Sequence, residues 1–301
     1  MSFDLKSYLS ERRELVEAEL ARVAKLPALV HGSSGLVPTS LAESMNYSLL
    51  AGGKRLRPIL ALAGCEAMGQ KPEVALRFGC AVEMIHTYSL IHDDLPAMDN
   101  DDFRRGRPTN HKVYGDAMAI LAGDALLTDA FALTTQCPAP AEVIVEIVRE
   151  LSFSAGSPGM VGGQVIDVEA TGKPIDLAQL KVLHAMKTGA LFDVSLRGGA
   201  RLGGATAEQL SQVRVYAQAL GLAFQIVDDV LDVTQDLATL GKDPGSDREA
   251  GKTTYVDLLG VEGALAHARQ VMDEGIAALT PFGPHAEPLR ALGNYTVDRK
   301  N

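Results

Sequence analysis

Two groups of aspartates lie at the ends of long apolar stretches of the sequence. Clustered carboxylates repel one another, and among apolar neighbours this repulsion grows unless cations compensate it. Carboxylate oxygens are hard ligands, suited to Mg²⁺ that is bound jointly with phosphate groups. A solvated helix end or a run of N-caps would explain either group alone, but the occurrence of two favours a metal site. The first group is Asp93, Asp94 and Asp99, followed by Asp101 and Asp102, and the second is Asp228, Asp229 and Asp232.

The spacing within each group constrains the helix that carries it. Asp228 and Asp232 are one turn apart and share a helix face, and the residue after Asp228 lies about 100° to the side. Asp93 and Asp99 lie about 120° apart on an ideal helix, so they converge only where that helix breaks. Pro96 predicts this break, because proline removes a backbone donor and clashes with the preceding turn.

Basic residues are few, but they concentrate where a phosphate group could bind. Three of them follow Gly52-Gly53 at the start of a helix, where free N–H groups also favour anions. Any one of these side chains alone would be ordinary surface charge. Together with the aspartates they indicate a site for anionic groups, held partly by Mg²⁺ and partly by Arg and Lys. The basic residues concerned are Lys54, Arg55, Arg57, Arg104, Arg105, Arg107, Lys187, Lys242 and Lys252.

The elements that must position these residues are helices. The 301 residues are 47% hydrophobic but only 5% aromatic, and Ala, Leu and Gly dominate, which favours helices packed closely through small side chains. Apolar residues recur at helical spacing almost throughout. We therefore predict an all-α fold, one domain over residues 1–301, as a large bundle of about ten or more helices. The expected helices are 5–26, 38–50, 57–68, 73–94, 116–137, 141–154, 160–170, 177–202, 207–235, 261–279 and a short one near 287–295.

Charge and cysteine content exclude several classes of protein. The net charge of −10 argues against a general nucleic-acid binder, which needs a basic face. Cys65, Cys80 and Cys137 are odd in number and widely spaced, so neither a disulfide framework nor a zinc site is indicated. The N-terminus shows no signal peptide, and no stretch reaches the roughly 18 uninterrupted apolar residues of a membrane span. We expect a cytoplasmic protein.

Five motifs occur in order along the chain, and together they resemble a known family. On these motifs the sequence is similar to the trans-isoprenyl diphosphate synthases, most of all to bacterial farnesyl diphosphate synthases (geranyltranstransferases), from about Leu41 to the C-terminus. The resemblance implies an all-helical fold around a deep central cavity, usually as a homodimer, with the aspartate motifs facing each other across the cavity mouth. The motifs are Gly53-Lys54-Arg55-Leu56-Arg57-Pro58, Leu90-Ile91-His92-Asp93-Asp94 through Arg104-Arg105-Gly106, Gly162-Gly163-Gln164, Lys187-Thr188-Gly189 and Phe224-Gln225-Ile226-Val227-Asp228-Asp229.

The resemblance also implies a role for each site residue. Mg²⁺ ions, about three per active site, would bind the diphosphate of the allylic substrate. Their protein ligands would be Asp93, Asp94, Asp99, Asp228, Asp229 and Asp232. Whether Asp99 or Asp101 completes the first motif is open. Isopentenyl diphosphate would be bound by Gly53, Lys54, Arg57, His86 and Arg105. The allylic diphosphate would be bound by Arg104, Lys187, Thr188, Gln225, Lys242 and Lys252. The residues expected to carry catalysis are Asp93, Asp99, Asp228 and Lys187.

Further residues have competing interpretations. His86 would be a buried structural histidine, but it lies two turns before Asp93 and can share its face. Tyr88 would be an ordinary core aromatic, yet in the resembling family a bulky residue here, with Ser89, forms the floor that limits product length. Gln164 and Asp167, at i and i+3, could steady the carbocation or the water around the metal. His92 and His184 are expected to be structural.

The resemblance implies a reaction, and three alternatives stay open. We expect ionisation of an allylic diphosphate, attack by isopentenyl diphosphate and loss of a proton, with farnesyl diphosphate as the main product. A geranylgeranyl diphosphate synthase is the nearest alternative. A class I terpene cyclase would not need a second diphosphate site such as Lys54-Arg55-Leu56-Arg57, and a non-catalytic helical subunit would not need both acidic motifs. The glycine-rich loop 241–252 is expected to close over bound diphosphate.

Overall fold

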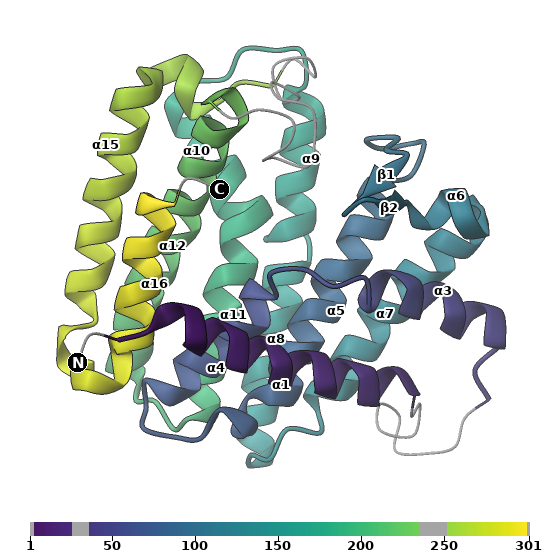
Figure 1. Cartoon of the computed structure of the whole chain (residues 1–301), viewed down its shortest axis with the longest axis horizontal. Helices are drawn as coiled ribbons and strands as arrows, with labels where there is room; N and C mark the ends of the chain where they lie inside the picture. Colours follow the sequence, from purple (N-terminus) through teal and green to yellow (C-terminus); the bar gives the residue numbers. More distant parts are fainter. Residues whose placement is uncertain (1–2, 26–35, 235–251, 300–301) are drawn as a thin grey trace.

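The computed structural model describes residues 3–25, 36–234 and 252–299. Over these residues the chain is almost entirely helical, which confirms the predicted all-α fold (Figure 1). The elements are α1 (Leu5–Lys25), α3 (Thr39–Leu49), α4 (Leu56–Glu66), η1 (Pro72–Val74), α5 (Leu76–Asp93), β1 (Phe103–Arg104), β2 (Arg107–Pro108), α6 (Asn110–Tyr114), α7 (Asp116–Thr134), α8 (Ala141–Ala155), α9 (Met160–Ala170), α10 (Leu177–His184), η2 (Ala185–Gly189), α11 (Ala190–Leu202), α12 (Ala207–Thr234), α15 (Tyr255–Ala278), η3 (Thr280–Ala286) and α16 (Glu287–Asp298).

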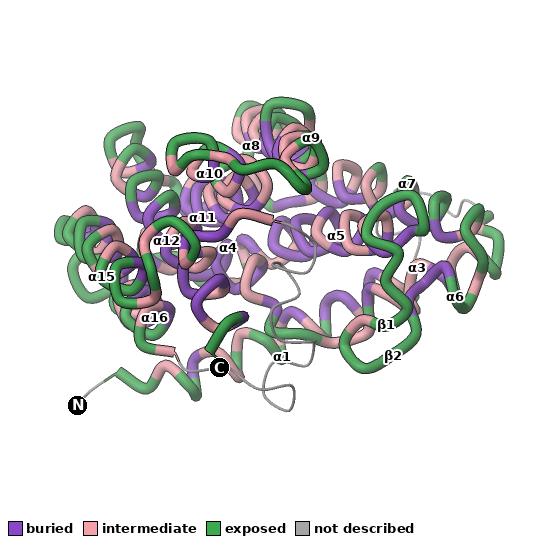
Figure 2. Tube along the Cα trace, turned by 90° about the horizontal axis from the view of Figure 1, so that it is seen from above, coloured by how far each residue is buried: buried purple, intermediate pink, exposed green. Residues whose placement is uncertain are grey.

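The long helices pack side by side in the order α15, α12, α11, α4, α5 and α7, and α1 crosses α4 and α5 (Figure 1). Helices α4 and α11 occupy the middle of this order, and the tube coloured by burial shows them largely purple (Figure 2). Nearly every residue of α4 from Pro58 to Cys65 is buried, as expected for a central helix that is apolar on all sides. The outer helices α15 and α16 expose one face.

Small residues allow the two central helices to approach closely. A Cβ atom placed on Gly199 of α11 would lie 1.9 Å from the carbonyl oxygen of Ala61, and one on Gly64 of α4 would lie 2.3 Å from that of Leu196. Neither contact is sterically allowed, so both positions require glycine. This is the packing through small side chains that the composition predicts.

The structure departs from the expected elements in several places. The segment 177–202 is interrupted by a π-helical turn, η2, instead of forming one α-helix. Helix α15 begins earlier than expected, at Tyr255, and is kinked at Gly260, where φ is 69°. The short helix α6 and the two-stranded antiparallel hairpin β1–β2 were not predicted. Two-residue strands are too short to leave an alternating pattern, which explains why the sequence gives no sign of them.

Among the described residues, α7 is the one helix long and apolar enough to cross a membrane by length and composition. Its apolar run is interrupted by Asp124 and Asp129. Ala119, Ala122 and Leu126 are fully buried, and the helix packs along α5. This packing accounts for part of its apolar character, since 39% of the apolar window is buried, and one such helix does not show a membrane span.

Candidate active site

A cavity of about 660 Å³ lies between α5, α9 and η2. Asp93 lies at the end of α5 on its wall, and Lys187 and Thr188 of η2 stand opposite. Lys187 and Thr188 also line a neighbouring pocket of about 170 Å³, whose wall includes Asp229 and other residues from the second half of the chain. The π-helical turn therefore separates a compartment beside the first aspartate motif from one beside the second.

The first motif leaves its helix where Pro96 predicts. Helix α5 ends at Asp93, and the chain folds back so that the amide of Asp99 donates to the carbonyl of Asp93 over 2.9 Å. Burial raises the pKa of Asp93 to about 6, Lys187 opposes this shift and the nearby Asp99 adds to it. The break thus brings Asp99 close to Asp93, which lines the cavity.

Asp94 faces the other way from this pair. Its Oδ1 accepts a hydrogen bond from Nε of Arg104 at 2.7 Å, and its side chain is almost fully buried. Burial raises the pKa of Asp94 to about 6, although Arg104 lowers it. Asp101 lies 3.7 Å from the same guanidinium. Asp99 therefore lies near Asp93, whereas Asp101 lies near Arg104, which is bonded to Asp94.

The second motif on α12 is partly engaged by the C-terminal part of the chain. Arg299 donates to Oδ1 of Asp228 at 2.5 Å, and its guanidinium lies 4.2 Å from the ring centre of Phe224. Asp229 is buried and accepts a hydrogen bond from the amide of Tyr255, at the start of α15, over 2.8 Å. Sequence reasoning missed Arg299, because nothing in its immediate sequence places it beside Asp228.

The donor set suits Mg²⁺ that is bound together with phosphate. Among the described residues no three carboxylate, histidine or cysteine side chains are gathered closely enough to hold an ion by themselves. Mg²⁺ usually binds through one or two carboxylates plus substrate phosphates, so a ready-made cage is not required. Asp93 with Asp99 on one side, and Asp228 with Asp232 one helical turn apart on the other, provide such partial sets. The residues therefore fit the metal.

Four of the five residues expected to bind isopentenyl diphosphate come together in the structure. Arg57 and His86 line the same cavity, and the guanidinium of Arg105 lies 3.0 Å from where a Cβ of Gly53 would be. Nε of Arg57 is buried without a hydrogen-bond partner among the described residues. Burial lowers the pKa of Arg57 to about 10, so it remains cationic at neutral pH. Burial and the neighbouring Arg57 and Arg105 hold the pKa of His86 well below its usual value, so His86 is neutral.

The fifth residue, Lys54, lies exposed beside this cluster, but its neighbour Arg55 points inward. Arg55 is buried and is bonded to Glu17 at 2.7 Å, Glu83 at 2.8 Å and the carbonyl of Leu49 at 2.7 Å. Of the three cations on this glycine-rich turn, Arg55 is thus used to attach the turn to α1 and α5.

Most described residues expected at the allylic diphosphate gather around η2, but Arg104 is bonded to Asp94 and lines another pocket. Thr188, Gln225 and Lys252 line the pocket of about 170 Å³. Asp167 of α9 accepts a hydrogen bond from Nζ of Lys187 at 2.6 Å and lies 3.4 Å from Nζ of Lys252. Burial raises the pKa of Asp167, but the two ammonium groups lower it by more, and the result is below its usual value. Lys242 and loop residues 241–251 lie outside the described residues.

Gln164 and Asp167 line different pockets. Gln164 lines the large cavity, whereas Asp167 lines the smaller pocket. Asp167 is paired with Lys187 and Lys252, and its expected role, like that of Gln164, stays a prediction.

The glycine pair of the third motif sets the position of η2. A Cβ on Gly163 would lie 2.3 Å from the amide nitrogen of Lys187, and one on Gly162 would lie 2.8 Å from Cε of Met186. We expect Gly163→Ala to reduce stability by roughly 1–3 kcal/mol through overpacking. Because Lys187 would shift, turnover should fall by about 10²-fold.

Urea unfolding and steady-state rates check this prediction. Gly263→Ala is the matched control, since its Cβ would meet Leu259 at an ordinary 3.4 Å. Equal stability and rate for Gly163→Ala and Gly263→Ala would show that the close approach does not position Lys187.

Tyr88 and Ser89 lie on the cavity wall below Asp93. The Tyr88 ring is buried and meets the ring of His92 edge-on, with 5.6 Å between their centres. The opposite wall is made by Val161, Val165 and Val168 of α9, which are exposed to the cavity. Sequence reasoning missed these valines, although their spacing marks one apolar face of the helix.

His92 and His184, expected to be structural, both make packing contacts. Nε2 of His92 lies 3.1 Å from the carbonyl of Ile120, and His184 stacks on Tyr255 with 5.7 Å between ring centres. Nε2 of His184 is buried and has no hydrogen-bond partner among the described residues. Burial lowers the pKa of His184 to about 4.

A histidine that is protonated only after unfolding makes stability depend on pH. Because the pKa of His184 is lowered in the folded protein, its contribution to stability is retained above about pH 6.5 and is lost as the pH falls toward 4. The loss from His184 alone would be about 3 kcal/mol. His184→Phe keeps the stacking ring without the titration, so its unfolding free energy should fall less steeply between pH 7 and 4. Parallel curves of unfolding free energy against pH for the unsubstituted protein and His184→Phe would contradict this prediction. His285→Phe is the control, since His285 is exposed.

The helical bundle, with the first aspartate motif beside the large cavity and the second beside the neighbouring pocket, has an isoprenoid synthase fold. Residues 38–280 match the family model for polyprenyl synthetase. The chain is 48% identical over 301 residues to a dimethylallyltranstransferase of Fischerella ambigua, covering 99% of this chain and 84% of the relative. It therefore belongs to the polyprenyl synthetase family, the trans-isoprenyl diphosphate synthases.

Other relatives carry different product names. The chain is 46% identical to a geranylgeranyl diphosphate synthase of Cyanophora paradoxa, covering 100% of this chain and 98% of the relative. It is 47% identical to a farnesyl diphosphate synthase of Geobacillus stearothermophilus over 86% of each chain. A solved geranyltransferase of Helicobacter pylori, complexed with magnesium and isoprenyl diphosphate, superposes with a TM-score of 0.81 at 33% identity, covering 99% of this chain and 98% of that chain.

Proposed function

We propose that this prenyltransferase condenses isopentenyl diphosphate with dimethylallyl or geranyl diphosphate and makes mainly farnesyl diphosphate. The observation that carries the proposal is the large cavity, which Asp93, Arg57 and Lys187 line together with Tyr88 and apolar residues of α9. Arg105 lies near Gly53 and Arg57, and Lys252 lines the neighbouring pocket together with Lys187. Two diphosphates and a growing hydrocarbon chain would be accommodated there.

Different residues would bind each of the two diphosphates. Lys187, Thr188, Gln225 and Lys252 would hold the allylic diphosphate, while Lys54, Arg57 and Arg105 would hold isopentenyl diphosphate, with neutral His86 available as a hydrogen-bond partner. Mg²⁺, held through Asp93 and Asp99 and through Asp228 and Asp232, would supply Lewis-acid neutralisation of the leaving diphosphate. The allylic C–O bond then breaks, a C–C bond forms to isopentenyl diphosphate, and a proton is lost, with the released diphosphate as the proton acceptor.

The product length follows from the chamber. The growing chain would extend from the diphosphates along α5, where the Tyr88 ring, which lines the cavity one to two turns before Asp93, would block it. This supports a C15 product over the C20 product of a geranylgeranyl diphosphate synthase, which stays the alternative.

Purified protein incubated with Mg²⁺, isopentenyl diphosphate and geranyl diphosphate tests the proposal. We expect a C15 product, and EDTA should abolish its formation. Folded protein that forms no elongated product under these conditions would refute the proposed activity.

We also propose a homodimer in the cytoplasm. Ile120 and Leu121 of α7 are 44% and 54% exposed, an apolar surface that a second copy could cover. Cys65, Cys80 and Cys137 are free and buried, which suits a reducing compartment. Analytical ultracentrifugation checks the dimer.

A further inference from the structure

A second cavity, slightly larger than the first, lies on the other side of η2. Its volume is about 730 Å³, and it is bounded by α8, α10, η2, α11 and α12. This is within the roughly 300–1,000 Å³ range of small-molecule pockets. Lys187 and Thr188 do not line it, but Ala185, Met186 and Gly189 of the same turn do. None of the residues assigned to the proposed reaction contributes to this rear cavity.

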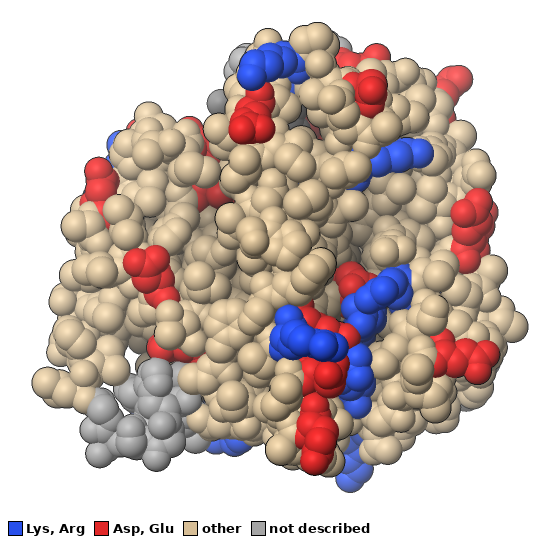
Figure 3. Space-filling view, turned by 180° about the vertical axis from the view of Figure 1, so that it is seen from behind, with Lys and Arg blue, Asp and Glu red and all other residues tan. Residues whose placement is uncertain are grey.

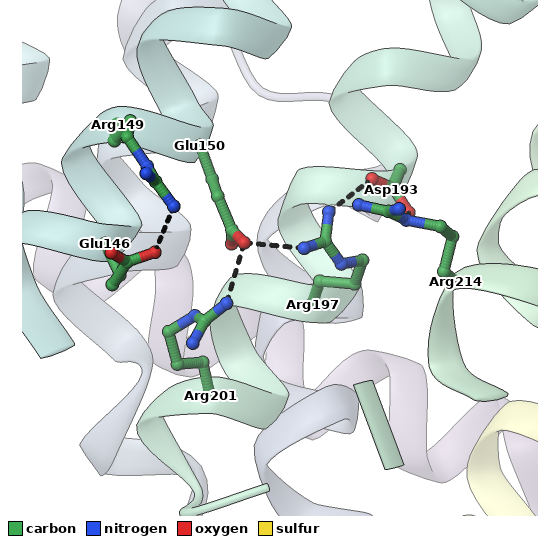
Figure 4. Close-up of polar contacts among 7 residues, drawn as sticks. All are labelled: Glu146, Arg149, Glu150, Asp193, Arg197, Arg201 and Arg214. Carbon is green, nitrogen blue, oxygen red and sulfur yellow. Dashed lines mark hydrogen bonds and ion pairs between the residues drawn. The ribbon is translucent and has the colours of Figure 1, made fainter. Parts of the chain in front are cut away.

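The rear cavity combines an apolar wall with a buried ionic network (Figure 4). Arg197 is 9% exposed and donates to Glu150 at 2.5 Å and to Asp193 at 3.0 Å. Arg201 adds a second bond to the same oxygen of Glu150 at 2.7 Å. The carboxylates of Glu150 and Asp193 are therefore already compensated by the two arginines of α11.

Four buried atoms of this network have no hydrogen-bond partner among the described residues. They are Oε2 of Glu150, Oδ1 of Asp193, and Nε of Arg197 and of Arg201. Buried polar groups in proteins are almost always hydrogen-bonded to protein, water or ligand. Glu150, Asp193 and Arg197 line the cavity, so its polar end lies against a network that the described residues leave incompletely hydrogen-bonded.

The remaining charges at the cavity are positive. Arg149, Lys181 and Arg214 line it, and the side chains of Arg149 and Arg214 are 72% and 51% exposed. Arg149 bonds at the surface to Glu146, and Arg214 lies 3.9 Å from Asp193. The rim of the cavity therefore favours anions. Figure 3 shows the face opposite to that of Figure 1, where Lys or Arg side chains and Asp or Glu side chains adjoin one another below the middle of a mostly uncharged surface.

The apolar wall is formed by Phe153, Pro158, Met186, Ala190 and Leu222. Phe153 is 62% exposed, so this wall is partly open to solvent. We propose that the rear cavity binds an amphiphilic anion, with its apolar chain against this wall and its phosphate or carboxylate head at Arg149, Lys181 and Arg214. This binding goes beyond the proposed reaction and requires no turnover.

A tryptophan reporter tests the proposal at the cavity itself. The chain contains no Trp, and exposed Gln218 of α12 lines the cavity, so Gln218→Trp places one fluorophore there. Dodecyl phosphate is the probe. We expect a saturable change in Trp emission, weakened at least tenfold when Arg149→Glu and Arg214→Glu are added. Arg13→Glu, an exposed charge reversal on α1, is the matched control and should leave the titration unchanged.

Further arms identify the head group and the chain. Dodecanol and inorganic phosphate should each give no saturable change at concentrations where dodecyl phosphate saturates. Tighter binding of farnesyl monophosphate than of dodecanoate would assign the site to prenyl phosphates, and the reverse would assign it to fatty acids. Calorimetry repeats the test without the Gln218→Trp reporter. It compares the unsubstituted chain with a chain that carries only the two charge reversals.

Clear outcomes would overturn the proposal. One is an unchanged Trp emission together with no calorimetric difference between the unsubstituted and charge-reversed chains. Another is equal binding of dodecanol and dodecyl phosphate. Because the assay measures binding without substrates, a protein that fails to make prenyl diphosphates can still bind the probe, so the two failures are distinguishable.

Discussion

Asp93→Ala and Asp228→Ala are each expected to lower kcat/KM by about 10³-fold or more, with the helical content unchanged. Each carboxylate belongs to one of the two partial ligand sets, and loss of the metal-assisted neutralisation of diphosphate removes several kcal/mol of transition-state stabilisation. Steady-state kinetics at saturating Mg²⁺ measure the loss, and circular dichroism monitors the fold. Near-normal turnover in both variants would show that the motifs do not hold the catalytic metal.

The two substitutions are expected to differ in their effect on stability. Asp93 is partly buried near Asp99 and its pKa is raised by burial, so removing its charge should raise the melting temperature of the metal-free protein. Asp228→Ala should lower it, because the Arg299 side chain, 4% exposed, loses its carboxylate partner. Asp102→Ala is the control: this exposed aspartate follows the first motif and pairs with Lys112 at 2.7 Å. It should retain both rate and stability.

Tyr88→Ala is expected to shift the main product from C15 to C20, with no change in the metal requirement. The substitution removes an aromatic ring from the wall of the chamber below Asp93, and the space gained would accommodate about one more isoprene unit. The pocket closes by bulk, so the ionisation step should proceed as before. Chromatography of the dephosphorylated products measures the chain length.

Tyr88→Phe separates bulk from the hydroxyl group. It retains the ring and should keep farnesyl diphosphate as the main product. C20 product from the unmodified enzyme, or an unaltered profile from Tyr88→Ala, would exclude Tyr88 as the floor. Phe and Trp to Ala changes in tightly packed cores cost about 3–5 kcal/mol, but Tyr88 borders an open chamber, so a smaller loss of stability is expected.

The helical class and the family could be predicted because their signals are local. Helical periodicity, the proline after Asp93 and the ordered motifs are all properties of short segments, and the structure confirms the all-α bundle and the break at Pro96. The family assignment is confirmed by the match over residues 38–280. The individual roles of the site residues, the single domain over 1–301 and the C15 product stay predictions.

Only the tertiary structure determines the contacts between segments that are far apart in the chain. Arg55 and Arg57 are two residues apart and equally basic, yet the αL conformation at Arg55 directs it to Glu17 and Glu83, while Arg57 reaches the cavity. Asp167 joins Lys187 and Lys252, which are separated by 65 positions of sequence (252 − 187).

The same reason explains the two features that no sequence pattern marked. Arg299 reaches Asp228 across 71 residues, and the rear cavity is assembled from α8, α10, α11 and α12. Sequence by itself determines which residues can carry charge, turn or pack, because these are properties of a side chain and its neighbours. Which charges compensate one another, and which are left facing a cavity, depends on burial and on helix packing, and these exist only once the bundle has formed.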